Sequence, residues 1–166
     1  KDVLIVNAAG NEGLNLDENN VYPNDQFVEE PTEYADNVLS VGALNYVYGS
    51  DMLASFSNFG QTNVDVFAPG TQIWSTTPNN EYEFLQGTSM AAPAVTGIAA
   101  VIRSFYPSLS ANQVKQIIMD SGLSSSATVV IGGDPSNTEK FGGLSTSGNM
   151  ANLYNALILA DKVSKQ

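Results

Sequence analysis

The sequence predicts an α/β fold in which helices pack against a mostly parallel β-sheet. Short and almost wholly apolar runs, such as VLIVNAA at 3–9, are typical of parallel strands that are covered on both faces. Longer apolar segments with helical spacing follow them, and this mixture of buried strands and helices indicates the α/β class. The 166 residues, 43% hydrophobic and 14% charged, are enough for one globular domain with a sizeable core.

Three core strands are expected, and turn-forming residues close two of them. The run at 3–9 ends at Gly10, NVLSVGA covers 37–43, and VDVFAPG at 64–70 stops at Pro-Gly. Because the first run is almost continuously apolar, we expect it to lie in the buried centre of the sheet.

The remaining non-helical segments are more polar. Residues 12–37 are acidic, contain two prolines, and predict a long surface loop. Two short extended pieces, 73–76 and 81–86, flank the turn PNN. Residues 123–148 are rich in Ser, Gly and Thr and predict loops with one short strand, TVVIGG.

Three helices are expected. The first runs from Thr88, as N-cap, to about Phe105, and Pro93 fits only in its first turn, where its missing N–H costs no hydrogen bond. The third covers about 152–162. The second has a capping box, an apolar stripe and a C-terminal glycine, which are Ser110 with Gln113, then Val114, Ile117 and Ile118, and finally Gly122.

The charge balance restricts the partners. With 6 basic and 17 acidic side chains, the net charge is −11 and the pI is near 4.1, which argues against binding to nucleic acid or an anionic membrane surface. The uncharged stretch 84–102 contains Pro93 and two glycines, so it indicates a buried core helix and no membrane insertion. Since there is no cysteine, the chain has no disulfide and no thiolate metal site.

The motif GTSMAAP at 87–93 places Ser89 at the start of a very apolar helix. Gly87 lets the backbone bend or approach closely, and the helix N-terminus offers free N–H groups and a positive dipole end to a developing oxyanion. A serine in this place often does no more than satisfy a backbone N–H, which is the structural alternative to a nucleophile.

The motif NAAGN at 7–11 follows a predicted parallel strand. In an open α/β sheet, ligands bind at the carboxyl ends of such strands. Asn11 therefore could direct an amide donor at an oxyanion, although asparagine is also common as an ordinary turn residue.

Together these motifs resemble those of the subtilisin-like serine proteases, the subtilase family. The resemblance covers nearly the whole chain and implies a three-layer α/β fold with a mostly parallel sheet. GTSMAAP is similar to the serine motif and NAAGNEG to the oxyanion strand. Further similar segments are ASFSNFG at 54–60, VDVFAPG at 64–70, IWSTT at 73–77 and the closing helix GNMANLYNAL at 148–157.

The resemblance implies a serine endopeptidase that hydrolyses protein or peptide substrates through an acyl-enzyme. Ser89 would be the nucleophile, and the Asn11 side chain would bind the oxyanion together with the backbone N–H of Ser89. Ala8, Ala9 and Gly10 would form one wall of the substrate pocket, and Thr88 would add a contact near the oxyanion. Members are mostly secreted, so a secreted or cell-envelope protein is expected.

One departure from the family is the absence of a general base. In subtilases the Asp and His of the triad precede the oxyanion strand, whereas this sequence has no histidine and starts directly before that strand. We therefore expect residues 1–166 to be the C-terminal portion of one catalytic domain, inactive without its N-terminal half. The alternative is a pseudoprotease or interaction module, and the sequence preceding Lys1 would discriminate between them. A lipase-like elbow is disfavoured because Ala91 replaces its second glycine.

No cofactor is assigned. Calcium is common in the family, and the loop offers oxygens from Asp17, Glu18, Asn19, Asn20 and Asp25. Their spacing is not that of an EF-hand, so a solvated loop is the favoured interpretation.

Overall fold

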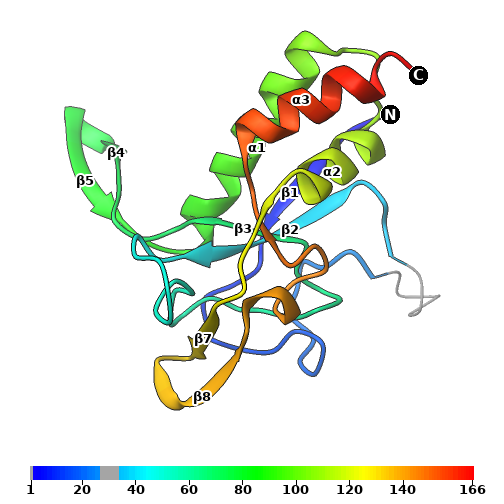
Figure 1. Cartoon of the computed structure of the whole chain (residues 1–166). Helices are drawn as coiled ribbons and strands as arrows, with labels where there is room; N and C mark the ends of the chain where they lie inside the picture. Colours follow the sequence, from blue (N-terminus) through cyan, green and yellow to red (C-terminus); the bar gives the residue numbers. More distant parts are fainter. Residues whose placement is uncertain (1, 27–33) are drawn as a thin grey trace.

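The computed structural model of the chain describes residues 2–26 and 34–166, and a five-stranded sheet lies at its centre (Figure 1). Along the sheet the order is β1-β2-β3-β9-β6. The first four strands are parallel and β6 is antiparallel to β9, which confirms the mostly parallel sheet. Their bounds are β1 Ile5–Ala8, β2 Val38–Leu44, β3 Val66–Pro69, β6 Leu123–Ser124 and β9 Asn149–Met150.

The position of β1 differs from the expectation. Among the described strands it lies at the edge of the sheet and pairs with β2 alone, although its sequence suggested a central strand. Val3 and Ile5 are consequently 49% and 52% exposed. The apolar run at 3–9 indicates burial on both faces, and the sequence pattern contains no information on whether the outer edge is paired.

The described helices pack on one face of this sheet (Figure 1). They are α1 Thr88–Phe105, α2 Ala111–Asp120 and α3 Leu153–Val163. Inward side chains of β2 and β3 meet all three helices in the larger apolar core, and α1 lies directly against β1, β2 and β3. By length and composition α1 could also span a membrane, and a third of its residues are buried in the chain described here.

The start of α1 lies one residue away from the predicted position. Gly87, not Thr88, is the N-cap. Pro93 was predicted in the first turn but lies inside the helix, beyond that turn. The helix continues past it because the buried residues that follow pack against the sheet. Its ring nitrogen has no hydrogen to donate, so the carbonyl of Ser89 loses its usual helical partner.

The second helix follows its sequence signals more closely. Ser110 and Gln113 form the predicted capping box, and the predicted apolar stripe of α2 is buried. Gly122 has no positive φ, so it is not a left-handed helix terminator. It is required because a Cβ there would lie 2.6 Å from Cβ of Asn149 and 2.7 Å from the carbonyl oxygen of Met150.

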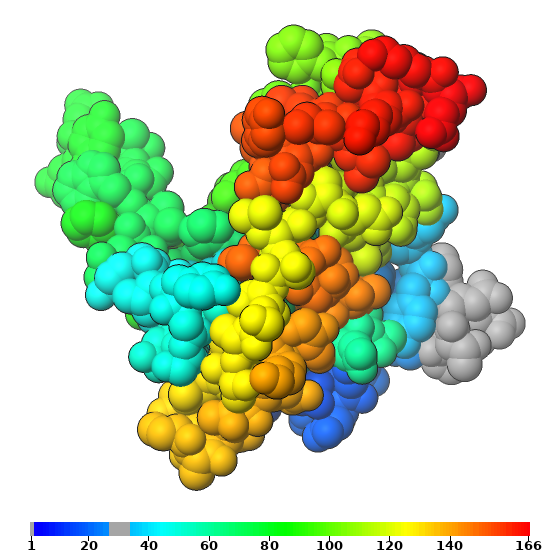
Figure 2. Space-filling view, viewed as in Figure 1, coloured from blue at the N-terminus to red at the C-terminus, as the bar shows by residue number. Residues whose placement is uncertain are grey.

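Two hairpins lie outside the central sheet. The first, β7 Thr128–Ile131 with β8 Asp134–Lys140, covers a smaller core on the face opposite the helices. Only β7 was expected, because β8 is polar and exposed along its whole length. The second, β4 Ile73–Thr77 with β5 Glu81–Leu85, confirms the predicted extended pieces. It projects from the body of the molecule, joined by the turn Pro78–Asn80 (Figures 1 and 2).

Candidate active site

The end of β1 and the start of α1 meet at the carboxyl edge of the sheet. β1 ends at Ala8 and the chain turns at Gly10. The hairpin β4–β5 returns to the same edge, where the backbone N–H of Gly87 donates to the carbonyl of Gly70 over 2.8 Å. The helix therefore begins at the place where ligands bind in open α/β sheets.

Thr88 connects the two sequence motifs through three hydrogen bonds. Its backbone N–H donates to Oδ1 of Asn11 over 2.9 Å, and its hydroxyl donates to the same oxygen over 3.0 Å. The hydroxyl also accepts from the backbone N–H of Gly10 over 3.1 Å. Because Thr88 is fully buried, this contact orients the Asn11 carboxamide with its oxygen inward. Among the described residues, Nδ2 of Asn11 has no acceptor.

Gly87 leaves an open position between two nitrogen donors. A Cβ at this residue would lie 3.5 Å from Nδ2 of Asn11 and 3.7 Å from both the backbone nitrogen of Ser89 and Oδ1 of Asn11, the oxygen that Thr88 holds. An anionic oxygen in this space would face an amide N–H and a helix N-terminal N–H, the donor arrangement that stabilises developing negative charge. Ser89 itself is exposed, so its hydroxyl is accessible to a substrate.

The predicted pocket wall, 8–10, is only partly available. Ala8 and Ala9 belong to the cores on opposite faces of the sheet, and Ala9 is 3% exposed. Their side chains therefore pack within the protein, and a substrate would meet mainly the backbone of this segment. Gly10 turns with φ of +107°, a conformation that favours glycine.

Asn58 supports this turn and was not identified as a functional residue from the sequence. It is fully buried, and its Nδ2 donates to the carbonyl of Ala9 over 2.9 Å while its Oδ1 accepts from the N–H groups of Glu12 and Leu14. A Cβ at Gly10 would lie 2.4 Å from Nδ2 of Asn58. The only signal in the sequence is the segment ASFSNFG that contains it.

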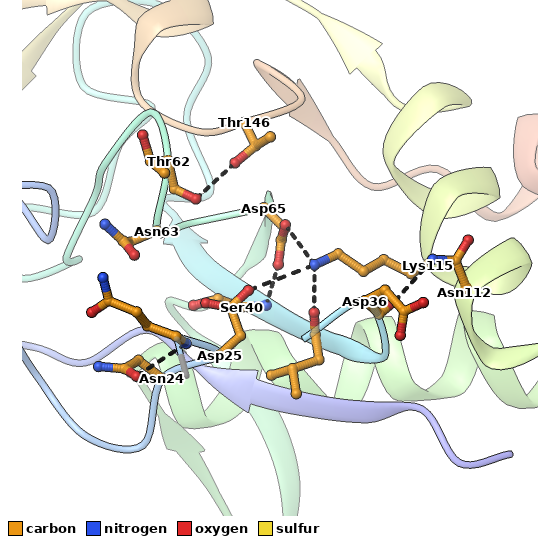
Figure 3. Close-up of polar contacts among 12 residues, drawn as sticks. Asn24, Asp25, Asp36, Ser40, Thr62, Asn63, Asp65, Asn112, Lys115 and Thr146 are labelled. Carbon is orange, nitrogen blue, oxygen red and sulfur yellow. Dashed lines mark hydrogen bonds and ion pairs between the residues drawn. The ribbon is translucent and has the colours of Figure 1, made fainter. Parts of the chain in front are cut away.

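A buried ionic cluster joins the long loop, the sheet and α2 near the start of β2 (Figure 3). Nζ of Lys115 lies 3.1 Å from Oδ1 of Asp65 and 3.8 Å from Oδ2 of Asp25, and it donates to the carbonyl of Val38. Burial raises the pKa of both carboxyls above its ordinary value, despite the lowering effect of Lys115. This cluster was not predicted from the sequence, although a lysine beside the apolar stripe of α2 was a signal.

The loop carboxylates are not gathered as a metal site. Oδ1 of Asp17 accepts from the backbone N–H groups of Thr62 and Asn63, while Asp25 faces Lys115. Within 2–26 and 34–166, no group of three His, Cys, Asp or Glu side chains is placed to hold a metal ion.

Similar sequences come from one protease family. A model of the family described as the Subtilase family matches residues 1–149. Subtilisin DY from Bacillus licheniformis is 42% identical over 126 residues, which are 76% of this chain and 40% of that protein. Subtilisin BL from Lederbergia lenta is 34% identical over 139 residues, which are 84% of this chain and 46% of that protein.

Solved structures agree on the α/β fold. The self-cleaved protease domain of PatA has a TM-score of 0.65 and 27% identity, covering 97% of this chain and 51% of that chain. The A-subunit of the AB5 toxin from E. coli has a TM-score of 0.71 and 24% identity, covering 95% of this chain and 50% of that chain, so its likeness concerns the fold alone. The chain thus spans about half of these structures and less than half of the curated relatives above.

Proposed function

The chain belongs to the subtilase family, and we propose that it carries the nucleophile and the oxyanion donors of a serine endopeptidase. Oγ of Ser89 attacks the carbonyl carbon of a peptide bond while a base takes its proton; the C–N bond then breaks, the amine leaves with that proton, and water hydrolyses the remaining acyl-enzyme. The observation that carries this proposal is the attachment of the Asn11 carboxamide to Thr88, immediately before Ser89.

In the proposed mechanism two donors stabilise the tetrahedral oxyanion. Nδ2 of Asn11 and the backbone N–H of Ser89 border the space above Gly87, so both can donate to one oxygen. Thr88 holds the oxygen of the carboxamide and thereby acts as a positioning residue. The backbone of 8–10 borders the substrate side chain.

The proposed mechanism needs a base that this sequence does not supply. A serine hydroxyl is a weak nucleophile until an adjacent base removes its proton, and the 166 residues include no histidine. We therefore propose that a further part of the catalytic domain brings the triad His and Asp, with residues 1–166 as the C-terminal portion. Among the described strands β1 has no partner on its outer edge, and Val3 and Ile5 are half-exposed. Parallel sheets normally have both faces covered and their edges paired or protected, so this strand supports the proposal.

The alternative is a pseudoprotease or interaction module that keeps the fold without the base. Two observations favour the protease. Asn11 Nδ2 remains without an acceptor among the described residues, and Gly87 leaves the space next to it open. Because Asn11 is exposed, its Nδ2 is accessible and can donate to a substrate oxygen in place of water.

Hydrolysis of casein by the complete protein tests the proposed function. The parent should cleave casein, and Ser89→Ala should abolish cleavage, whereas Ser104→Ala on the exposed end of the same helix should have no effect. Asn11→Ala should lower kcat by about 10²–10³ with little change in KM, the loss known for an oxyanion donor in a subtilisin. Full activity of Ser89→Ala would refute the proposal.

The 166-residue chain alone should fail the same assay. With the oxyanion donors alone, peptide hydrolysis would be at most about 10³–10⁴-fold faster than the uncatalysed reaction in water, as in a subtilisin without its triad. We also propose, from the family, that the protein acts on proteins or peptides outside the cell or at its envelope. Its charge of −11 and the packing of α1 on the sheet support the absence of nucleic-acid binding and membrane insertion.

A further inference from the structure

The hairpin β4–β5 has an aromatic face that is open to solvent. Trp74 and Phe84 are directly opposed across the two strands, with ring centroids 4.7 Å apart and planes tilted by 56°. Tyr82 lies diagonally from Trp74 and stacks on it, at 6.2 Å and 16°. Trp74 and Tyr82 are each 57% exposed and Phe84 is 63% exposed. The three rings therefore form one continuous surface.

The opposite face of the hairpin has a different character. Side chains alternate along each strand, so Ser75, Glu81 and Glu83 lie on the face away from the rings. Both glutamates are exposed, and the segment 70–87 contains no lysine or arginine. That face also carries Ile73 and Leu85 at the base of the hairpin, but its middle and tip are polar or charged, so the aromatic face is the one suited to burial against an apolar partner.

The hairpin also lacks support from the rest of the described chain. Its strands form a separate two-stranded sheet within the described residues, and every residue of β5 is exposed. Figure 2 shows the hairpin standing clear of the helices in that view. A two-stranded hairpin is marginally stable by itself, and exposed apolar patches of this kind mark interaction surfaces. The aromatic face is therefore expected to be covered in the complete protein.

We propose that this face docks against a segment of the same catalytic domain that lies outside residues 1–166. The inference rests on the proposed function, which requires such a segment to bring the base. Two solved relatives match 97% and 95% of this chain with only 51% and 50% of their own length. About half of each relative thus has no counterpart in residues 1–166, which is enough chain to supply a segment that covers the hairpin.

The connection between the hairpin and Ser89 favours this occupant. β5 ends at Leu85, and the hydrogen bond from Gly87 to Gly70 fixes the base of the hairpin at the start of α1. A base must come within hydrogen-bond reach of Ser89, so its segment has to pass beside this end of the helix. The aromatic face is a large apolar surface joined to that end, and its occupant should present apolar side chains.

Photo-cross-linking in the complete protein tests this docking. The cross-linking amino acid p-benzoylphenylalanine replaces Phe84 on the aromatic face or, as the matched control, Ser75 on the opposite face. We expect position 84 to cross-link within one molecule to a peptide outside 1–166, with a yield at least about fivefold above that from position 75. Cross-links to a second copy, cross-links only to an added casein peptide, or a yield equal to the control would each overturn the inference.

Radical labelling of the unmodified protein gives an independent measurement. Tyr82 should react with hydroxyl radicals at least about fivefold more slowly than Tyr48, which is 74% exposed, because both are tyrosines and only Tyr82 should be covered. Equal rates would overturn the inference. Casein hydrolysis is measured on the same sample: hydrolysis with a freely labelled Tyr82 refutes the docking alone, whereas a protected Tyr82 without hydrolysis refutes the proposed function alone.

Discussion

The hydroxyl of Thr88 donates a hydrogen bond of 3.0 Å to Oδ1 of Asn11, although 77 positions separate the two residues in the chain. The backbone N–H of Thr88 donates to the same oxygen, so the carboxamide is held at one end only. Its other end, Nδ2, lies beside the open position at Gly87. In the proposed mechanism Thr88 thus determines which end of Asn11 meets the substrate.

Replacing Thr88 with valine should reduce the turnover of the complete protease without abolishing folding. The variant loses the hydroxyl bond to Asn11 and leaves the N–H of Gly10 without its acceptor. Losing this neutral hydrogen bond and leaving the N–H of Gly10 unpaired together cost about 1–3 kcal/mol, so kcat should fall by roughly 5–100-fold with a smaller change in KM.

Two further variants separate positioning from a general structural effect. Thr88→Ser keeps the hydroxyl and should recover most of kcat. Thr96→Val removes a hydroxyl that bonds to the carbonyl of Ala92 on the same helix and should leave kcat unchanged. A Thr88→Val protein with kcat within about twofold of the parent would show that the carboxamide is oriented without this bond.

Gly87→Ala should damage activity in a different way. The added Cβ would occupy the space between Nδ2 of Asn11 and the N–H of Ser89, and the φ of +145° disfavours any residue with a side chain. We expect a loss of kcat of at least about 10²-fold, together with destabilisation of about 1–3 kcal/mol. Steady-state kinetics and urea unfolding measure the two effects, and an active Gly87→Ala protein would rule out oxyanion binding in this space.

The ionic cluster around Lys115 predicts a pH dependence of stability. Burial raises the folded-state pKa of Asp25 and Asp65, so between the ordinary carboxyl pKa of about 4 and the raised values the folded state binds more protons than the unfolded state. The free energy of unfolding contributed by these groups is therefore highest below that window and falls as pH rises through it.

Asp25→Asn tests this sign with little change in shape. The neutral side chain no longer has to be desolvated as a charge, so Tm should exceed that of the parent at pH 7, while the two proteins should have equal Tm at pH 3. Asp36→Asn, at a neighbouring exposed aspartate, is the matched control and should show no such difference. A lower Tm for Asp25→Asn at pH 7 would mean that attraction to Lys115 outweighs desolvation.

Local sequence signals predicted much of the fold. The capping box of Ser110 and Gln113 is completed by neighbouring residues, so α2 could be located without knowledge of the tertiary structure. The apolar runs that became β1, β2 and β3 are likewise local patterns. The polar strand β8 lacked such a pattern, because its position depends on pairing with β7 and not on burial of its own side chains.

The candidate site was predictable only in part, because its contacts join segments that are distant in the sequence. Family motifs pointed to Ser89 and Asn11, but the bond between Thr88 and Asn11 depends on how two distant segments meet. The burial of Asn58 and the pairing of Lys115 with Asp65 also arise from tertiary packing, which periodicity does not encode. The edge position of β1 depends on strand order, which a single apolar run cannot specify.

A crystal structure of the complete protein after reaction with a peptidyl phosphonate tests the central claim most directly. The phosphonate should be attached to Oγ of Ser89, with one phosphoryl oxygen about 3 Å from both Nδ2 of Asn11 and the backbone nitrogen of Ser89, and with Oδ1 of Asn11 still bonded to Thr88. An adduct on another residue, or a phosphoryl oxygen that faces solvent with neither nitrogen within about 4 Å, would contradict the account.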